Sequence, residues 1–162
     1  GSMDPTFASG QYLIVDQISY RFEEPERGDV IIFRYPYNTK KTFFIKRIIG
    51  LPSETVELKN KIISITDKKG GKHTISNESY IDSKGNKDDN DPSLLFKNIR
   101  LKDDEYFVMG DNRTNSSDST VWGALKKSYI VGKPFLRLFP FNRINITPGS
   151  GMPVISEADS KN

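Results

Sequence analysis

Two side chains and one polar loop in this sequence have the chemistry needed for hydrolysis: Ser2, Lys46 and residues 110–119. Lys46 lies in the run TFFIKRII at residues 42–49, among β-branched and aromatic residues. Burial in such a strand disfavours the charged ammonium and lowers the pKa of the lysine. A neutral lysine amine can act as a general base. A serine, a buried lysine and a Gly-Asp-Asn-Arg loop together therefore indicate Ser–Lys hydrolytic chemistry.

Ser2 precedes the segment MDPTF at residues 3–7. Pro5 in this segment fixes its own backbone and favours extended geometry at the residue before it. Such a rigid segment can hold a serine hydroxyl at the mouth of a groove. The competing interpretation is that Gly1 and Ser2 are a cloning remnant and that Met3 is a start residue. A remnant explains Gly-Ser-Met, but it does not explain the Asp-Pro-Thr-Phe that follows.

Lys46 and Arg47 are neighbours in the same strand-like run, so alternation places them on opposite faces. Lys46 then shares its face with Phe44 and Ile48, and one of the two charges must be buried or paired. The alternative is an edge strand from which the ammonium of Lys46 reaches solvent, which is the commoner fate of a strand lysine.

The loop GDNRTNSSDS at residues 110–119 follows a strand-like segment. An ordinary Asx-rich turn accounts for its glycine and asparagine residues, and Asp111 can pair locally with Arg113. Ten consecutive polar or small residues before Val-Trp-Gly nevertheless form a more specific pattern. Within that pattern, Ser116 can hydrogen-bond an amine base and Asp118 can buttress the loop.

Composition excludes several other classes of site. The 162 residues contain no cysteine and one histidine, so cysteine nucleophiles and disulfides are excluded, and a Ser–His–Asp triad would depend on His73. A net charge of +3 argues against a nucleic-acid surface. The acidic run at residues 88–91 lacks the glycine and glutamate of an EF-hand loop, and we expect a solvated loop there. We expect no metal and no cofactor.

The ordered segments have the lengths and compositions of β-strands, separated by Gly, Pro, Asn and Asp. No long amphipathic helical stretch is present. The sequence therefore predicts an all-β fold, with a short-stranded barrel or sandwich as the catalytic core. The expected strands cover residues 11–16, 29–34, 43–49, 54–58, 62–66, 105–109 and 129–138.

Residues 60–102 differ from the rest because they are rich in Lys, Asp, Asn, Ser and Gly. We interpret them as an inserted, variable β subdomain that can be shortened without loss of the core. The catalytic core is then formed by residues 1–59 and 103–146. Residues 147–162 are rich in Pro, Gly, Ser and acids, and we expect a disordered tail.

Four segments, taken in order, resemble the conserved boxes of bacterial type I signal peptidases. These are membrane-anchored Ser–Lys proteases that remove signal peptides from exported proteins. The resemblance spans about 120 residues and leaves out residues 60–102 and the tail. The four segments are residues 1–6 (GSMDPT), 28–33 (GDVIIF), 46–52 (KRIIGLP) and 110–119 (GDNRTNSSDS).

The resemblance assigns a role to each of six residues. It implies that Ser2 is the nucleophile, Lys46 the general base, Ser116 the group that orients the lysine amine and Asp118 the residue that holds the last loop, with Arg47 and Asp111 as a supporting ion pair. The family often has Arg two residues after this Asp, where the chain has Thr120. This departure implies a slightly different brace of the loop.

The implied function is a serine endopeptidase that cleaves preprotein signal peptides at Ala-X-Ala sites. Its implied place is the extracytoplasmic face of the bacterial cytoplasmic membrane, with an anchor upstream of Gly1. We also expect Phe7, Tyr35, Tyr37 and Phe43 to contact the membrane surface. Two alternatives remain open: a fragment of a self-cleaving repressor-type Ser–Lys protease, and a non-catalytic extracytoplasmic domain that binds peptide or lipid.

Overall fold

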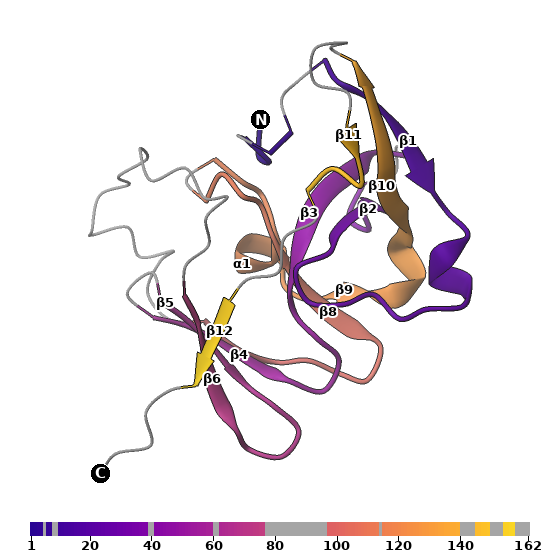
Figure 1. The fold of residues 1–162 in the computed structure, drawn as a ribbon. Coiled ribbons are helices and arrows are strands. Elements are labelled where there is room, and N and C mark those ends of the chain that lie inside the picture. The colour runs from indigo at the N-terminus through magenta and orange to yellow at the C-terminus, as the bar shows by residue number, and fades with distance from the viewer. Residues whose placement is uncertain are drawn as a thin grey trace.

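The computed structural model confirms the all-β prediction, with two antiparallel sheets and little helix (Figure 1). The short helical segments among the residues that the structure describes are η1 (Ser19–Arg21), α1 (Ser119–Trp122) and η3 (Lys127–Tyr129). The structure describes residues 1–4, 6–7, 10–38, 41–59, 62–76, 97–113, 115–139, 145–149 and 154–157. The acidic run at residues 88–91 lies outside them.

The first sheet carries the residues of the site. Its strands lie in the order β1-β10-β2-β3-β8-β9, and β11 also pairs with β10 (Figure 1). The strands are β1 (Tyr12–Asp16), β2 (Val30–Arg34), β3 (Phe43–Gly50), β8 (Glu105–Met109), β9 (Leu125–Lys126), β10 (Ile130–Phe139) and β11 (Asn145–Ile146).

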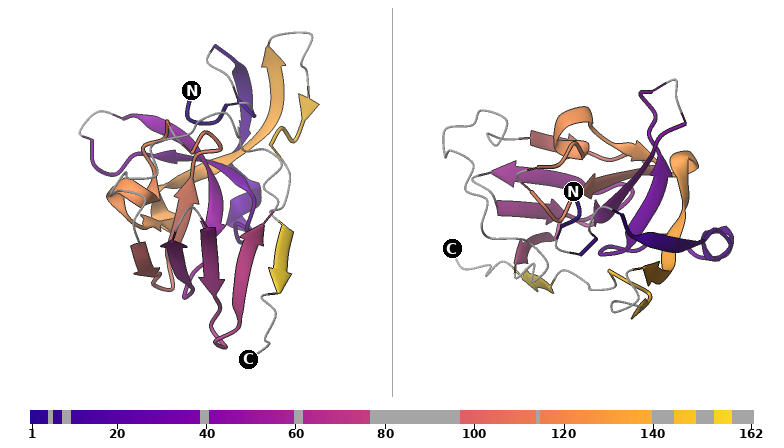
Figure 2. Two further views of the ribbon diagram at one scale, coloured as in Figure 1. Left: turned by 90° about the vertical axis from the view of Figure 1, so that its left-hand side faces the viewer. Right: turned by 90° about the horizontal axis from the view of Figure 1, so that it is seen from above.

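The second sheet lies beside the first and has the order β12-β6-β5-β4-β7 (Figure 2). The strands expected at residues 54–58 and 62–66 are present as β4 and β5, which pair in antiparallel register. The strands are β4 (Thr55–Lys59), β5 (Ile62–Thr66), β6 (Lys72–Ser76), β7 (Lys97–Arg100) and β12 (Val154–Glu157).

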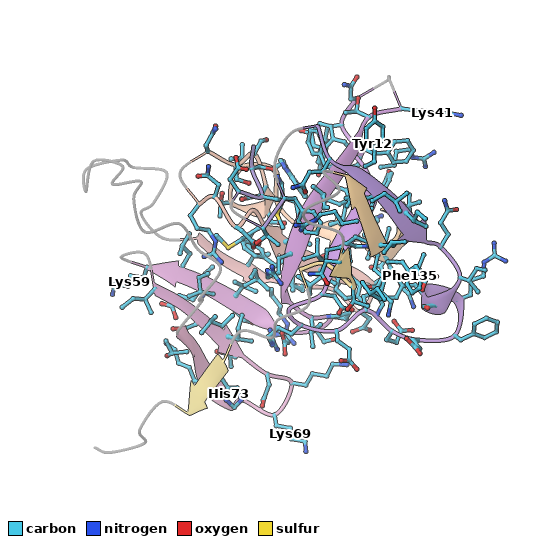
Figure 3. The ribbon with its side chains drawn as sticks, turned by 45° about the horizontal axis from the view of Figure 1, so that its top comes forward. Tyr12, Lys41, Lys59, Lys69, His73 and Phe135 are labelled. Atoms are coloured by element: carbon cyan, nitrogen blue, oxygen red, sulfur yellow. The ribbon has the colours of Figure 1, made fainter. Side chains whose placement is uncertain are left out.

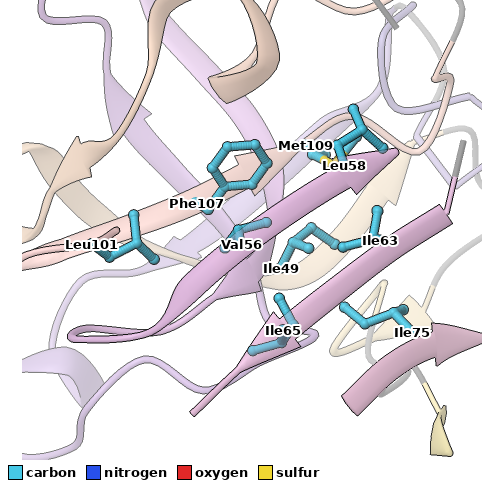
Figure 4. Packing of buried hydrophobic residues seen from close by; sticks show 9 residues of the cluster. All are labelled: Ile49, Val56, Leu58, Ile63, Ile65, Ile75, Leu101, Phe107 and Met109. Carbon is cyan, nitrogen blue, oxygen red and sulfur yellow. The ribbon is translucent and has the colours of Figure 1, made fainter. Parts of the chain in front are cut away.

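A shared hydrophobic core joins the two sheets, and this changes the picture of residues 60–102. Side chains of β4, β5 and β6 pack against Ile49 of β3 and against Phe107 and Met109 of β8 (Figure 4). The boundary at residue 59 also differs from the structure, because β4 belongs to the second sheet. The described part of residues 60–102 therefore contributes side chains to the core, and the expectation that the segment can be shortened without loss of the core stays a prediction.

The tail also differs from the expected disorder. Val154–Glu157 forms β12, which pairs in antiparallel register with β6, and Val154 lies opposite Ser76. Nearer the first sheet, the backbone N–H of Thr147 donates to Phe135 O at 2.7 Å. Long-range pairing of this kind leaves little local signal in a Pro/Gly/Ser-rich sequence.

Strand β3 is a central strand, paired with β2 on one side and β8 on the other. Its eight residues are rich in aromatic and β-branched side chains, which suit a strand covered by its neighbours. The interpretation of Lys46 as an edge-strand lysine is therefore wrong. Both Lys46 and Arg47 are buried, with exposed fractions of 3% and 1%.

Candidate active site

The structure brings Ser2 and Lys46 together although 44 residues separate them in the chain. Lys46 Nζ donates a hydrogen bond to Ser2 Oγ. Burial of the ammonium lowers the pKa of Lys46, and the negative charges of Asp118 and Asp111 partly oppose this effect. Among the described residues, no carboxylate forms an ion pair with Lys46. The arrangement therefore favours a neutral amine beside a hydroxyl, as Ser–Lys chemistry requires.

The segment that carries Ser2 is held by turns, by apolar anchors and by the last loop. Phe7 N donates to Met3 O at 2.7 Å, and Asn112 N donates to Ser2 O at 3.0 Å. Met3 and Phe7 are buried in one cluster with Val30. The expectation that Phe7 lies on a membrane-facing surface is therefore wrong, because its ring anchors the segment instead.

The loop at residues 110–119 reaches the site because it follows directly from β8. In the β3–β8 pair, Arg47 lies opposite Met109, so the next residues emerge beside Lys46. Arg47 Nε and Nη2 donate to the two carboxylate oxygens of Asp111 at 2.9 and 2.8 Å. This is the ion pair that the resemblance implied, and it is buried.

The Arg47–Asp111 pair also ties down three further segments. Thr6 Oγ1 donates to Asp111 Oδ2 at 2.6 Å, which connects the pair to the Ser2 segment. Arg47 Nη1 donates to the carbonyl oxygens of Gly28 and Gly149 at 2.8 and 2.7 Å. These contacts satisfy most of the guanidinium and both carboxylate oxygens, as burial of charge demands.

Asp118 holds the last loop by three hydrogen bonds. Its carboxylate accepts from Gly110 N at 3.0 Å, from Thr120 N at 3.1 Å and from Thr120 Oγ1 at 2.7 Å. Asp118 is also the N-cap of α1. Thr120, where the family often has Arg, thus braces Asp118 through its own hydroxyl.

Ser116 lies beside Ser2, but its hydroxyl oxygen is buried without a hydrogen-bond partner among the described residues. Gly110 separates the two serines, and a Cβ at Gly110 would lie 2.4 Å from both Ser116 Oγ and Ser2 O. Only glycine fits this close approach of backbones. The role of Ser116 in orienting the Lys46 amine remains a prediction.

Two hollows flank Ser2. One, of about 270 Å³, is lined by Ser2, Phe43, Phe44, Ile45, Lys46 and Ser117. The other, of about 300 Å³, is lined by Gly1, Ser2, Met3, Phe7, Gln11, Leu13 and Ile45. An apolar lining broken by few polar groups is typical of a binding site for a small or extended ligand.

Sequence reasoning missed several residues that the structure places at the site, notably Thr6, Gln11, Ser117 and Gly149. Thr6 belongs to the segment at residues 1–6 that contains Ser2, so its place in that segment could have identified it as a residue of the site. The contacts of Gln11 and Gly149 depend on packing between distant segments and left no local pattern.

Alternatives based on histidine or metal find no support in the described ranges. His73 lies on β6, where its ring contacts Asp67 at 3.3 Å, on the opposite side of the molecule from Tyr12 (Figure 3). No group of three or more His, Cys, Asp or Glu residues there is arranged to hold a metal ion. A search of the same residues for a helix long and apolar enough to cross a membrane also finds none.

Comparisons of the sequence with known proteins point to one family. The family described as "Signal peptidase, peptidase S26" matches residues 1–139. "Probable signal peptidase I-2" of Synechocystis sp. is 35% identical over 149 residues, which are 90% of this chain and 62% of that protein. "Signal peptidase I P" of Bacillus subtilis subsp. natto is 37% identical over 147 residues, which are 88% of this chain and 75% of that protein.

A solved structure gives the same result at the level of the fold. The crystal structure of a signal peptidase I from Enterococcus faecalis V583 aligns with a TM-score of 0.54 and 29% identity, and it covers 68% of this chain and 97% of that one. This chain spans less than two thirds of the length of the Synechocystis relative. The family match nevertheless covers most of the chain, and the chain belongs to the signal peptidase family, peptidase S26.

Proposed function

We propose that this chain is a serine endopeptidase that cleaves signal peptides from exported preproteins, with Ser2 as nucleophile and Lys46 as general base. The observation that carries the proposal is the hydrogen bond from the buried Lys46 amine to Ser2 Oγ. Family membership supports the reaction class. The relatives reported above bear the name signal peptidase I.

The chemistry follows from the positions of these two groups. Neutral Lys46 takes the proton of Ser2 as Oγ attacks the peptide carbonyl carbon, and the tetrahedral oxyanion forms. Collapse breaks the C–N bond, and Lys46 returns the proton to the leaving amine. Water then attacks the acyl-serine ester, again with Lys46 as base. The C–Oγ bond breaks, Lys46 returns the proton to Ser2 Oγ, and the new carboxyl group leaves. The resemblance assigns the backbone N–H of Ser2 to the oxyanion hole.

The substrate would be an extended segment with small residues at the first and third positions before the cut, of the Ala-X-Ala type. An extended peptide can add along the edge of the groove by backbone pairing and place alternate side chains in pockets. The two hollows beside Ser2 suit such alternate side chains.

We further propose contact with the membrane surface at the extracytoplasmic face of the bacterial cytoplasmic membrane. Tyr37 and Phe43 are 62% and 55% exposed, and Tyr35 and Tyr37 pack with Trp122 in one aromatic cluster. Exposed aromatic rings of this kind suit the headgroup interface. Liposome co-sedimentation of the wild type and of Tyr37→Ser/Phe43→Ser tests this, with the exposed Phe22→Ser as control. Equal sedimentation by all three proteins would contradict membrane contact through this cluster.

Incubation with an Ala-X-Ala signal-sequence peptide, followed by mass spectrometry, tests the proposed reaction. We expect cleavage after the second Ala by the wild type and none by Ser2→Ala. Cleavage by Ser2→Ala would remove the nucleophile assignment and favour the cloning-remnant interpretation. Absence of cleavage by the wild type would favour a non-catalytic peptide-binding or lipid-binding domain.

A further inference from the structure

One polar side chain that lines the hollow of about 300 Å³ beside Ser2, Gln11, has no role in the chemistry proposed above. Gln11 Oε1 is buried and has no hydrogen-bond partner among the described residues. Gln11 nevertheless lines this hollow together with Ser2. A buried carbonyl oxygen without a donor is costly, so it is a natural place for a ligand to supply one.

The backbone explains why Gln11 faces the hollow. Gly10 has a φ of +81°, a conformation that favours glycine, and the chain turns there into β1. Side chains two residues apart along an extended chain lie on the same side, so Gln11 and Leu13 point the same way. Both line the hollow. The side chain of Gln11 is therefore placed on one wall by the extended segment that leads into β1.

The rest of the lining that the structure describes is mostly apolar. It consists of the side chains of Met3, Phe7, Leu13 and Ile45, together with Gly1 and the hydroxyl of Ser2. A charged donor would lose its hydration in such surroundings without gaining a countercharge. A hydroxyl is small and neutral, and it can donate to the amide oxygen or accept from the amide nitrogen.

We infer that Gln11 is a specificity-determining residue, which favours a serine or threonine side chain at the peptide position that occupies this hollow. This inference rests on the proposed function and names a preference within it. A hydroxyl-bearing residue pairs with Gln11, whereas alanine at the same position leaves the amide oxygen unpaired.

The test compares kcat/KM for three peptides that differ only before the cut: Ala-X-Ala, Ser-X-Ala and Ala-X-Ser. We expect the wild type to prefer one serine peptide over Ala-X-Ala by about 3- to 10-fold, the range of one net hydrogen bond. Gln11→Met keeps the side-chain length and removes the amide. In this variant, the ratio of kcat/KM for the serine peptide to kcat/KM for Ala-X-Ala should therefore fall to about 1. Gln17→Met, at an exposed glutamine outside the hollow, should keep the wild-type ratio.

The outcomes are separable. A ratio of about 1 at both positions in the wild type overturns the inference whether or not the variants fold. An unchanged serine preference in Gln11→Met also overturns it, provided that this variant still cleaves Ala-X-Ala. If the wild type cleaves none of the three peptides, the proposed function fails and the inference fails with it.

Discussion

Arg47 and Asp111 are joined by two hydrogen bonds, from Nε to Oδ1 and from Nη2 to Oδ2, in a pair that is almost completely excluded from solvent. Arg47 follows Lys46 in β3, and Asp111 follows Gly110 at the start of the last loop. The pair thus fixes the distance between the strand of the base and the loop that contacts Ser2. Its main effect should be on stability and on the geometry of the site.

We predict that Asp111→Ala lowers the free energy of unfolding by about 3–5 kcal/mol, because Arg47 would remain buried without its countercharge. Urea denaturation monitored by fluorescence measures the change. Lys72→Ala is the matched control, since Lys72 and Glu57 form a more exposed pair and its loss should cost about 0–1 kcal/mol. Equal losses in the two variants would contradict the structural role of the buried pair.

The acidic limb of the plot of activity against pH should follow the loss of the proton from the Lys46 amine. Burial lowers the pKa of Lys46 from its ordinary value of 10.5, and the rate rises as the amine loses its proton. The negative charge of Asp118 raises this pKa, so Asp118→Asn should move the limb to lower pH. Asp104→Asn, an exposed substitution, should leave the limb in place. A limb that moves to higher pH in Asp118→Asn would contradict the electrostatic assignment.

The lowered pKa of Lys46 should also make the free energy of unfolding depend on pH, and the direction of this dependence can be predicted. Between the lowered pKa and 10.5, Lys46 is protonated in the unfolded chain and neutral in the folded one. Unfolding then takes up a proton, so this residue makes the protein more stable as pH rises through the window. Lys46→Met removes that contribution and should stabilise the protein most at low pH. Urea midpoints of both proteins over a pH series would converge as pH rises; a constant difference would contradict the burial of the ammonium.

Gly110→Ala should lower kcat/KM by about 100-fold, because the added Cβ forces Ser2 away from its position. The clash involves both Ser116 Oγ and the backbone carbonyl of Ser2. Adding Ser116→Gly removes only the first contact, so it should not restore the wild-type rate. Full rescue by Ser116→Gly would show that the Ser2 backbone tolerates the Cβ.

Local sequence patterns were sufficient for most of the first sheet. β2 and β3 are dense in β-branched and aromatic residues between turn signals. In the second sheet, β4 and β5 are likewise rich in β-branched residues. The positions of Ser2 and Lys46 could also be predicted, because the motifs that contain them occur in a recognised order. Their catalytic roles remain predictions, as do those of Ser116 and Asp118.

The remaining features depend on contacts between distant segments. The sequence around Phe7 is typical of an aromatic residue at the surface, yet Phe7 is buried in one cluster with Val30. Thr6 donates a hydrogen bond to Asp111, which lies 105 residues away in the sequence. β12, which follows all the other strands in the chain, pairs with β6. Such contacts depend on tertiary packing, which overrides local preference and leaves no periodic trace in the sequence.

The most direct measurement of the central claim is a double-variant cycle of kcat/KM on an Ala-X-Ala peptide, with Ser2→Ala, Lys46→Met and both together. Because nucleophile and base act as one unit, each single variant should lose about 10⁴-fold or more, and the double variant should lose no more than either one. Retained activity in Ser2→Ala, or losses that multiply in the double variant, would contradict a Ser2–Lys46 dyad.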